Sequence, residues 1–442
     1  MTDIGTEPSK VPMPLLFNLL YLAVLGMMIP ALAWRSWKTG RYQRLLRDKL
    51  AGLDNSPVTG DSPVAWFHGV SLGEVNLLKI VVAAFRKRHP DWQIIVSSTT
   101  DTGLAEARKH FGAAAVIPYP FDFSWAVART LRLVKPRFIA LAESELWPNF
   151  LYTAQRFQVP VVVLNGRMSP RTARRYAKVA GLARAMLFGR VSRFLMQSDR
   201  YADHLRRLGI PAARVRVTGS VKYDGVLADR THPKIDELRR LFAVTPSDII
   251  WVAGSTHEPE ERVVADIFAR LRPRFPNLRL IVVPRSPDRF SDVAGVIRNA
   301  GLACVRRSEM TGPVTDPAAV ILGDTMGELG AVWALATIGF TGGSLNAQRG
   351  GQSMIEPAGL GVPVLFGPHT FNFKDAVAGL LEVGGAVQVA DAADLERQLT
   401  TLLEDAGRRD VIGAAAREFV LKQQGATDRT LDEIDDLLKE TA

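Results

Sequence analysis

Cysteine is nearly absent from this sequence of 442 residues, in which Cys304 is the single example. One cysteine cannot form a disulfide within the chain, so a disulfide-held fold is excluded and a reducing compartment is favoured. The sequence also lacks a repeat of solenoid period and any low-complexity tract, which argues against a repeat protein. Its length favours two domains, and its hydrophobic content of 47% is ordinary for a globular protein.

Two features that would indicate other ligand classes are also missing. The segment His257-Glu258-x-x-Glu261 lacks the second histidine of a zinc-protease motif, so we expect no metal site. The net charge of +10 and the isoelectric point near 9.8 indicate an anionic partner: nucleic acid, a membrane surface or a phosphorylated ligand. Few aromatic residues accompany the basic ones, however, so we expect no nucleic acid partner.

Charge is absent from residues 11–34, a stretch long enough to cross a bilayer core of roughly 30 Å. Only Lys10 lies close before this stretch, whereas five basic residues follow it: Arg35, Lys38, Arg41, Arg44 and Arg47. By the positive-inside rule, this asymmetry places the bulk of the protein in the cytoplasm. We expect residues 1–50 to form an uncleaved N-terminal membrane anchor, although prolines and Asn18 leave a shallow interfacial helix open.

Beyond this stretch, apolar strand runs alternate with helical periods, as is typical of βα units. The first series has predicted strands at 64–67, 93–96, 114–117, 138–141, 160–164, 194–197 and 215–218. After a break at 219–234, the second series has them at 249–253, 278–283, 303–306, 319–322, 337–341 and 362–366. We therefore expect an α/β fold with two doubly wound domains, residues 51–225 and 226–442, whose strands point their carboxyl ends at a central cleft.

A glycine-rich stretch, TGGSLNAQRGGQSMIEP at residues 341–357, follows one of these predicted strands. We expect an anion to bind unpaired backbone N–H groups at its first glycines, helped by a helix that starts near Ser353. The residues concerned are Gly342, Gly343 and Ser344. Glu356, in the first helical turn, is then expected to reach a sugar hydroxyl. Spacing alone leaves a second interpretation open, in which Ser353-x-x-Glu356 is a capping box in a surface loop.

Carboxylates follow two strands of the first series. Glu74, in Ser71-Leu-Gly-Glu74, is placed to accept a proton from a hydroxyl group, but the same spacing also fits a capping box. Glu143 and Glu145 come after another strand. If strand geometry continues there, the two carboxylates share a face, and their repulsion raises the pKa of one. Interaction with a helix N-terminus is the alternative.

A basic helix is predicted after Ser169-Pro170, because serine caps helices and proline suits the first helical position. Four basic residues fall on one face of this helix, with Arg167 just before it: Arg171, Arg174, Arg175 and Lys178. No acidic residue lies between Leu164 and Arg193, so we expect this face to contact phosphate.

Three shorter motifs follow strands of the second series. Gly254-Ser255-Thr256-His257 is predicted to open the first helix of that series and to form another phosphate turn. Pro284-Arg285 and Met326-Gly327-Glu328 follow two other strands in the same layer. Each of these motifs has little specificity alone.

Taken together and in this order, these segments resemble the 3-deoxy-D-manno-octulosonic acid (Kdo) transferases, membrane-anchored glycosyltransferases of lipopolysaccharide assembly. The resemblance runs from the anchor to about Asp375 and rests on these motifs: HGVSLGE, STTDTG, ESELWPN, LNGRMS, VTGSVKYD, GSTHEPEE, VPRSPDR, GDTMGEL and GPHTFNFKD. It implies the GT-B architecture of two Rossmann-like domains. It also implies transfer of Kdo from CMP-Kdo to a lipid A precursor, lipid IVA, with inversion and without a catalytic metal or another cofactor.

The resemblance implies roles for individual residues. Glu74 matches the family's general base, and Glu143 and Lys222 match its transition-state stabilisers. The CMP pocket corresponds to Pro284, Arg285, Met326, Gly327, Glu328, Ser353, Met354, Ile355 and Glu356. Further donor contacts are expected from Ser255, Thr256, His257, Gly342, Gly343 and Ser344, and acceptor contacts from Arg167, Arg171, Arg174 and Arg175. In one departure, this chain has Gln352-Ser353 where the family usually has His-Asn.

The resemblance also implies a location at the cell inner membrane, with the catalytic domains on the cytoplasmic side. Two other functions stay open. One is a GT-B enzyme that uses a UDP-sugar, such as a lipid A disaccharide synthase or a nucleotide-sugar epimerase. The other is a membrane-tethered binder of acidic glycolipid without turnover, which the Gln352-Ser353 departure favours. No motif indicates how many Kdo residues are added, the acylation of the acceptor or the oligomeric state.

Overall fold

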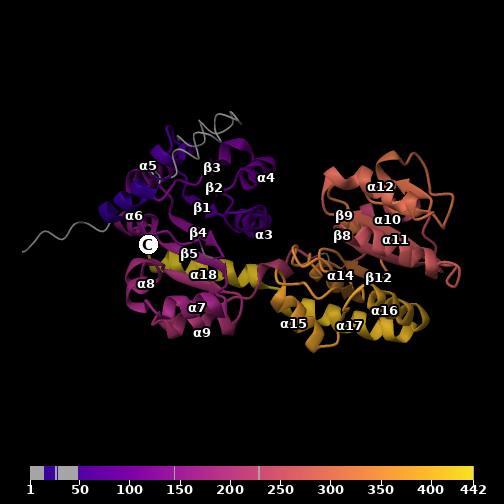
Figure 1. The fold of residues 1–442 in the computed structure, drawn as a ribbon. Helices are drawn as coiled ribbons and strands as arrows, with labels where there is room; N and C mark the ends of the chain where they lie inside the picture. The colour runs from indigo at the N-terminus through magenta and orange to yellow at the C-terminus, as the bar shows by residue number, and fades with distance from the viewer. Residues whose placement is uncertain (1–13, 25–26, 28–47, 144, 227–228, 442) are drawn as a thin grey trace, which may run out of the picture. The chain divides into compact units, whose positions relative to one another are not determined.

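A computed structural model describes residues 14–24, 27, 48–143, 145–226 and 229–441 of the chain (Figure 1). The chain divides into two compact units: unit 1 is Met1–Asp224 with Gln424–Ala442, and unit 2 is Gly225–Gln423. Half of the apolar stretch 11–34 lies outside the described residues. Within the described part of the chain, no helix is both long and apolar enough to cross a bilayer.

Unit 1 contains a parallel sheet of seven strands in the order β3-β2-β1-β4-β5-β6-β7. Its strands are β1 (Val64–His68), β2 (Gln93–Ser98), β3 (Val116–Pro118), β4 (Phe138–Ala142), β5 (Val161–Gly166), β6 (Arg193–Met196) and β7 (Val215–Val217). Its helices are α3 (Leu72–Arg88), α4 (Asp101–Phe111), α5 (Ser124–Val134), α6 (Pro148–Arg156), α7 (Pro170–Ala177), α8 (Ala180–Met186), α9 (Asp199–Arg207) and α18 (Ala426–Glu440). Each of the seven strands overlaps a predicted one.

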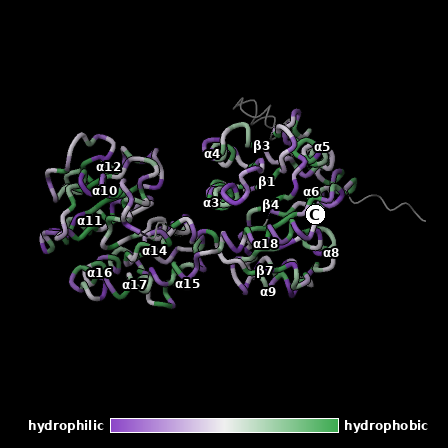
Figure 2. Tube along the Cα trace, turned by 180° about the vertical axis from the view of Figure 1, so that it is seen from behind, coloured by the Kyte–Doolittle hydropathy of each residue, from purple (hydrophilic) through white to green (hydrophobic). Residues whose placement is uncertain are grey.

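Apolar side chains fill both faces of this sheet, because successive residues of a strand point to opposite sides. On one face, Trp66 and Ile139 belong to a buried cluster with α5 and α6. On the other, Phe67 and Phe138 belong to a cluster with α3 and α18. Figure 2 shows hydrophobic, green segments along β1 and β4 and hydrophilic, purple segments on α3. A parallel sheet covered on both faces is the doubly wound arrangement that the sequence predicts.

Unit 2 contains a second parallel sheet of seven strands, in the order β10-β11-β9-β8-β12-β13-β14. Its strands are β8 (Ile249–Thr256), β9 (Leu278–Pro284), β10 (Cys304–Arg306), β11 (Val320–Leu322), β12 (Ile338–Thr341), β13 (Val364–Phe366) and β14 (Ala386–Gln388). Its helices are α10 (Pro233–Leu241), α11 (Glu260–Leu271), α12 (Phe290–Asn299), α13 (Leu329–Trp333), α14 (Ile355–Gly359), α15 (Lys374–Glu382), α16 (Ala392–Glu404) and α17 (Ala406–Gln423). Buried clusters lie on both faces of this sheet as well.

The last helix, α18, belongs to unit 1, whereas the sequence pattern predicts a second domain that contains all of residues 226–442. In Figure 1 the yellow α18 lies among the indigo and magenta elements of unit 1. Leu431 and Ile434 of α18 are buried in the core of that unit. The pattern of an amphipathic helix shows which of its faces is buried but not which sheet covers that face, so sequence order alone misassigned α18.

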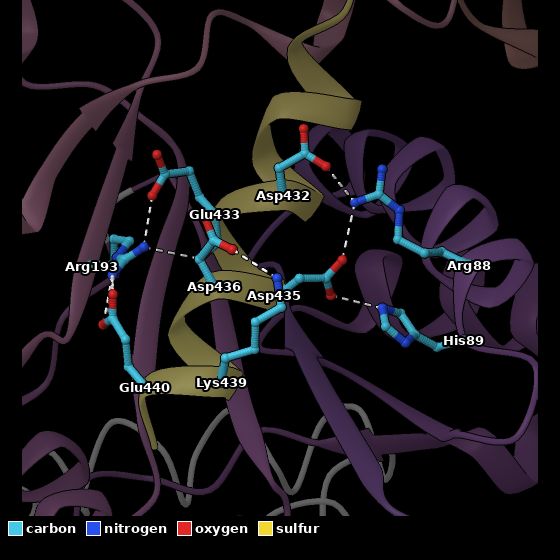
Figure 3. A network of polar contacts seen from close by, with 9 residues as sticks. All are labelled: Arg88, His89, Arg193, Asp432, Glu433, Asp435, Asp436, Lys439 and Glu440. Carbon is cyan, nitrogen blue, oxygen red and sulfur yellow. Dashed lines mark hydrogen bonds and ion pairs between the residues drawn. The ribbon is translucent and has the colours of Figure 1, made fainter. Parts of the chain in front are cut away.

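Ion pairs on two sides of α18 reinforce this packing (Figure 3). Arg193 of β6 is only 6% exposed, and its guanidinium donates to Glu433 at 2.7 Å and to Glu440 at 2.8 Å. On the other side of the helix, Arg88 of α3 donates to Asp435 at 3.1 Å. The C-terminal helix is therefore tied by charge and by apolar contact to the sheet of unit 1.

Candidate active site

The candidate residues cluster at two places where a sheet changes the direction of its strand order. In unit 1 this place lies between β1 and β4, which are paired neighbours. In unit 2 it lies between β8 and β12. Open parallel sheets bind ligands outside the carboxyl ends of their strands at this position, because the connecting loops diverge there. The loops after these four strands are thus the candidate sites.

Glu74 lies in the first turn of α3, directly after β1. Ser71 caps this helix by accepting the backbone N–H of Glu74 at 3.4 Å, so the serine half of the predicted capping box is present. The Glu74 carboxylate accepts hydrogen bonds from the N–H of Val70 at 2.8 Å and from the Ser71 hydroxyl at 3.3 Å. Burial nevertheless raises the pKa of Glu74 to about 7, and the negative charge of Glu143 adds to the rise. A carboxyl group with this pKa can accept a proton near neutral pH.

Glu143 is held beside two cations at the end of β4. Its Oε1 lies 3.2 Å from Nζ of Lys222, and its Oε2 lies 3.9 Å from Nε of Arg167. Lys222 comes from the segment after β7, so the fold brings it to Glu143 from a distant part of the sequence. Glu74, Glu143 and Lys222, which the resemblance assigns to catalysis, therefore all lie at the carboxyl edge of the unit 1 sheet.

The expectation that Glu143 and Glu145 share a face and repel each other is wrong. The strand ends at Ala142, and Glu143 has a left-handed φ of 60°, so the two side chains point to different partners. Glu145 lies 2.7 Å from Nε2 of His68 and accepts the indole N–H of Trp147 at 2.9 Å. Burial alone raises the pKa of Glu145, but these hydrogen bonds outweigh it and leave the pKa below its ordinary value.

The predicted basic helix is present as α7. Ser169 caps it by accepting the N–H of Thr172 at 3.1 Å, and Pro170 is its first residue. Among the described residues, no hydrogen bond or ion pair is formed by the side chains of three exposed arginines: Arg171, Arg174 and Arg175. These guanidinium groups are available to an external anion, whereas Arg167 faces Glu143.

In unit 2, the backbone N–H groups of the glycine loop after β12 are already paired. The N–H of Gly342 donates to the carbonyl of Gly254 at 2.9 Å. The N–H groups of Gly343 and Ser344 donate to the carboxylate of Glu260 at 2.7 and 2.9 Å. The expectation that these groups are unpaired is therefore wrong, because a buried carboxylate from α11 already fills the anion site. A donor contact through this loop stays a prediction.

The turn at 254–257 does not open a helix. Strand β8 continues to Thr256, and α11 begins only at Glu260, with Pro259 as its N-cap. Steric contact with a proline ring disfavours helical backbone in the residue before it, so a helix start ahead of Pro259 is disfavoured.

His257 lies at the centre of a basic group of side chains. Burial lowers the pKa of His257 to about 4, and the positive charges of Arg349, Arg289 and Arg285 lower it further. Its Nε2 lies 3.4 Å from Nε2 of Gln352, one of the two residues by which this chain departs from the family motif. His257 is therefore neutral at pH 7, and the positive charge at this site comes from the arginines.

Glu356 lies near Arg285 without a hydrogen bond to its carboxylate among the described residues. Burial raises the pKa of Glu356, and the positive charge of Arg285 opposes the rise. The helix α14 begins at Ile355 with Met354 as its N-cap and has no side-chain cap, so the capping-box interpretation of Ser353 and Glu356 is wrong. A partly buried carboxylate with spare acceptor capacity suits a ligand hydroxyl.

The motif at 326–328 has no described contact with Arg285 or Glu356. Met326 is 66% exposed. The carboxylate of Glu328 pairs with Lys234 at 2.7 Å and with Arg307 at 3.1 Å. These partners fix Glu328 within unit 2, and no described contact joins it to Glu356.

Sequence reasoning missed Glu260 and His68. Both are fully buried, and each binds a loop that carries a candidate residue. The only signal for these two residues in the sequence is their position. His68 lies at the end of β1, the first strand of unit 1, and Glu260 lies shortly after β8, the first strand of unit 2. An acidic residue in the first turn of a helix is usual for electrostatic reasons, so position alone does not distinguish Glu260.

Comparisons with known proteins show the family to which the chain belongs. Residues 40–225 match the family described as 3-deoxy-D-manno-octulosonic-acid transferase (kdotransferase). The chain is 33% identical over 399 residues to 3-deoxy-D-manno-octulosonic acid transferase of Haemophilus influenzae, covering 90% of this chain and 92% of that relative. It is 35% identical over 418 residues to the protein of the same name from Bordetella pertussis, covering 92% of each.

A solved structure supports the fold. The putative UDP-N-acetylglucosamine 2-epimerase from Listeria monocytogenes aligns with a TM-score of 0.58 and 14% identity, covering 86% of this chain and 98% of that one. At this identity the likeness concerns the GT-B-like fold of two parallel α/β sheets and carries no statement about activity.

Proposed function

This chain belongs to the 3-deoxy-D-manno-octulosonic acid transferase family and is a glycosyltransferase, and from this premise we propose that it transfers Kdo from CMP-Kdo to a phosphorylated lipid A precursor. The observation that carries the catalytic part is the environment of Glu74. Its carboxyl is partly buried after the carboxyl end of β1, with a pKa of about 7, beside the pair of Glu143 and Lys222.

Glu74 acts as the general base. A sugar hydroxyl is a poor nucleophile until a base takes its proton, and Glu74 accepts that proton while the hydroxyl oxygen attacks the anomeric carbon of Kdo. The bond from this carbon to the phosphate oxygen breaks, its electron pair goes to the phosphate, and CMP leaves. Attack from the face opposite CMP inverts the anomeric centre.

Glu143 and Lys222 stabilise the charges that develop during this step. Positive charge grows on the sugar ring as CMP departs, and the carboxylate of Glu143 suits it. Lys222, 3.2 Å from Glu143, supplies a cation for the Kdo carboxylate or the leaving phosphate.

Unit 2 binds the donor in this proposal. Arg285 meets the phosphate of CMP, and Glu356 accepts hydrogen bonds from the ribose hydroxyls. The support is the carboxylate of Glu356, which has no hydrogen bond within the described part of the chain and lies beside the charge of Arg285. The neutral ring of His257 and the amide of Gln352 provide further polar contacts at the same edge of the sheet.

Unit 1 binds the acceptor through α7. The exposed guanidinium groups of Arg171, Arg174 and Arg175 match a lipid that carries phosphate groups.

The N-terminal stretch 11–34 holds the protein at the cytoplasmic face of the inner membrane. Support comes from the helical residues 14–24, which Asn18 docks on unit 1: its Oδ1 accepts the N–H of Ser124 at 3.0 Å and the amide of Asn149 at 3.0 Å. Seven apolar residues of this stretch are exposed and suit a lipid environment: Leu15, Leu16, Leu19, Leu20, Leu22, Val24 and Met27.

Label transfer tests the proposed reaction. Purified protein is incubated with lipid IVA and either CMP-Kdo labelled in the Kdo or UDP-N-acetylglucosamine labelled in the sugar. We expect label in the lipid from CMP-Kdo only, with one CMP released per Kdo transferred. Transfer from the UDP-sugar would indicate a different GT-B enzyme, and binding of lipid IVA without release of CMP would indicate a binder without turnover.

A further inference from the structure

Glu260 is a fully buried carboxylate that binds four backbone N–H groups. Its Oε2 accepts from His257 at 2.9 Å and from Gly343 at 2.7 Å. Its Oε1 accepts from Ser344 and from Leu345, both at 2.9 Å. These donors belong to two different loops, the one after β8 and the one after β12, so a single side chain joins the two loops at the switch point of the sheet.

Four converging N–H groups are the arrangement by which proteins bind phosphate and other anions. In this chain the anion is part of the protein. Each carboxylate oxygen accepts two hydrogen bonds, which is the full acceptor capacity of an ionised carboxylate. Burial raises the pKa of Glu260, and the four N–H groups oppose that rise by favouring the charged form.

The bonds to Glu260 continue into the donor residues. The carbonyl of Gly343 accepts the N–H of Gly351 at 2.8 Å, and the carbonyl of Gly342 accepts the N–H of Gln352 at 3.0 Å. Gln352 leads directly into α14, which carries Glu356 in its first turn. These bonds therefore tie the glycine loop to the segment that leads into α14.

The loop is also tightly packed against its neighbours. A Cβ atom at Gly342 would lie 2.5 Å from Cα of Thr256 and 2.8 Å from the Glu260 carboxylate. A Cβ atom at Gly343, whose φ is 67°, would lie 3.2 Å from the His257 ring. The two glycines let the backbone approach the carboxylate closely enough for hydrogen bonds.

We propose that Glu260 is a positioning residue for the nucleotide of the donor, which it serves as a built-in anion that fixes the loops after β8 and β12. The donor phosphate is consequently bound by side chains such as Arg285, and the N–H groups of the glycine loop stay with Glu260. This inference rests on the proposed function in two respects: the nucleotide is CMP, and it lies against Arg285 and Glu356.

Chemical rescue tests the proposal. Glu260→Ala removes the carboxylate and leaves four N–H groups around a small space that formate can fill. We expect the affinity for CMP, measured by calorimetry on the full chain, to fall about tenfold or more, because the loops lose their charged hydrogen bonds. Added formate restores most of that affinity, whereas chloride at the same ionic strength does not. Formate leaves the wild type unchanged.

Glu261→Gln is the matched control. Glu261 is the next residue of α11, is equally buried and binds Arg289 at 2.6 Å, but it accepts no N–H from either loop in the described structure. We expect its CMP affinity to stay within about threefold of the wild type and to show no response to formate.

The outcomes separate the two proposals. If the wild type does not bind CMP, the proposed donor is wrong. If the wild type binds CMP but folded Glu260→Ala binds it equally well, or formate restores nothing, the positioning role is wrong.

Should Glu260→Ala fail to fold, Glu260→Gln decides, because glutamine keeps the volume but has only one acceptor oxygen. A raised donor KM with unchanged acceptor KM supports the role, and an unchanged donor KM contradicts it.

Discussion

Glu74 keeps a pKa of about 7 although two hydrogen bonds reach its carboxylate, because the cost of burying the charge exceeds their stabilisation. Glu145, on a neighbouring loop, is also partly buried, yet hydrogen bonds from His68 and Trp147 keep its pKa below the ordinary value. The pKa values of two carboxyl groups at one edge of the sheet are thus shifted in opposite directions. Such a pair divides into a group that exchanges protons near pH 7 and a group that stays charged.

Variants of the ion pair between Glu143 and Lys222 should move the pKa of Glu74 in opposite directions. Glu143 raises this pKa by charge repulsion, and Lys222 partly neutralises Glu143. We expect Glu143→Gln to shift the acid limb of the pH–rate profile to lower pH, and Lys222→Met to shift it to higher pH. The measurement is kcat/KM for the acceptor between pH 5 and 9. Shifts in the same direction would show that this pair does not act on the base.

Glu356→Ala should weaken CMP binding. A hydrogen bond to a charged group contributes about 1.5 to 3 kcal/mol, which is roughly ten- to hundredfold in affinity. The loss should appear for CMP as well as for CMP-Kdo, and it should shrink for a 2′,3′-dideoxy analogue that cannot form the bond. Calorimetric titration measures it. Unchanged CMP affinity in a folded variant would place the nucleotide elsewhere.

At the scale of elements, the strands were the most predictable part of the fold. Runs such as residues 64–67 are apolar throughout, because both faces of the sheet are covered. This pattern can be recognised in the sequence alone. The edge strand β14 was missed. The start of α11 was misplaced because a proline set the boundary, and the pairing of Glu260 with a distant loop has no local signature.

In the candidate site, too, contacts between residues distant in the sequence could not be predicted. Positions after strands identified Glu74, Glu143 and Arg285, because parallel strands end at one edge of a sheet. Which of these groups are paired internally depends on contacts across the sequence. Glu328, for example, is held by Lys234 and Arg307, and no spacing in the sequence indicates those partners.

Helix α7 should contribute to acceptor binding through charge. Replacing Arg174 and Arg175 together with alanine is expected to raise the acceptor KM several-fold and to weaken its salt dependence, with little change in donor KM. The control replaces Arg206 and Arg207 on α9, another exposed helix of unit 1. An equal loss with a dephosphorylated acceptor, or in the control, would show that α7 has no specific role in phosphate recognition.

At the scale of the whole molecule, unit 1 is built from two separate parts of the chain. Asp224 accepts hydrogen bonds from the N–H groups of Gly425 and Thr427, so the points where the chain leaves and re-enters unit 1 are tied together. Arg193 ties the end of α18 to β6. The stability of unit 1 therefore depends on residues at both ends of the sequence.

Arg193→Met should destabilise unit 1 selectively. Removing one partner of an ion pair costs about 3 to 5 kcal/mol where the other charge stays buried; Glu433 and Glu440, which remain here, are 24% and 60% exposed, so the cost should lie below that range. Hydrogen exchange should show faster exchange in the strands of unit 1 and no change in unit 2. Arg397→Met, which breaks an exposed pair with Asp394, is the control and should cost about 0 to 1 kcal/mol. Equal effects in both units would contradict a separate unit 1.

The most direct test of the account measures transfer of labelled Kdo to lipid IVA as a function of pH, with wild-type protein and with Glu74→Gln. A base with a pKa of about 7 must be ionised to act, so the wild-type rate should rise up to pH 7 and level off above it. Glu74→Gln keeps the shape of the side chain but cannot take a proton, so its rate should fall by roughly two to four orders of magnitude and lose this pH dependence. Normal turnover by folded Glu74→Gln, with the same acid limb, would show that Glu74 only caps α3 and that another group is the base.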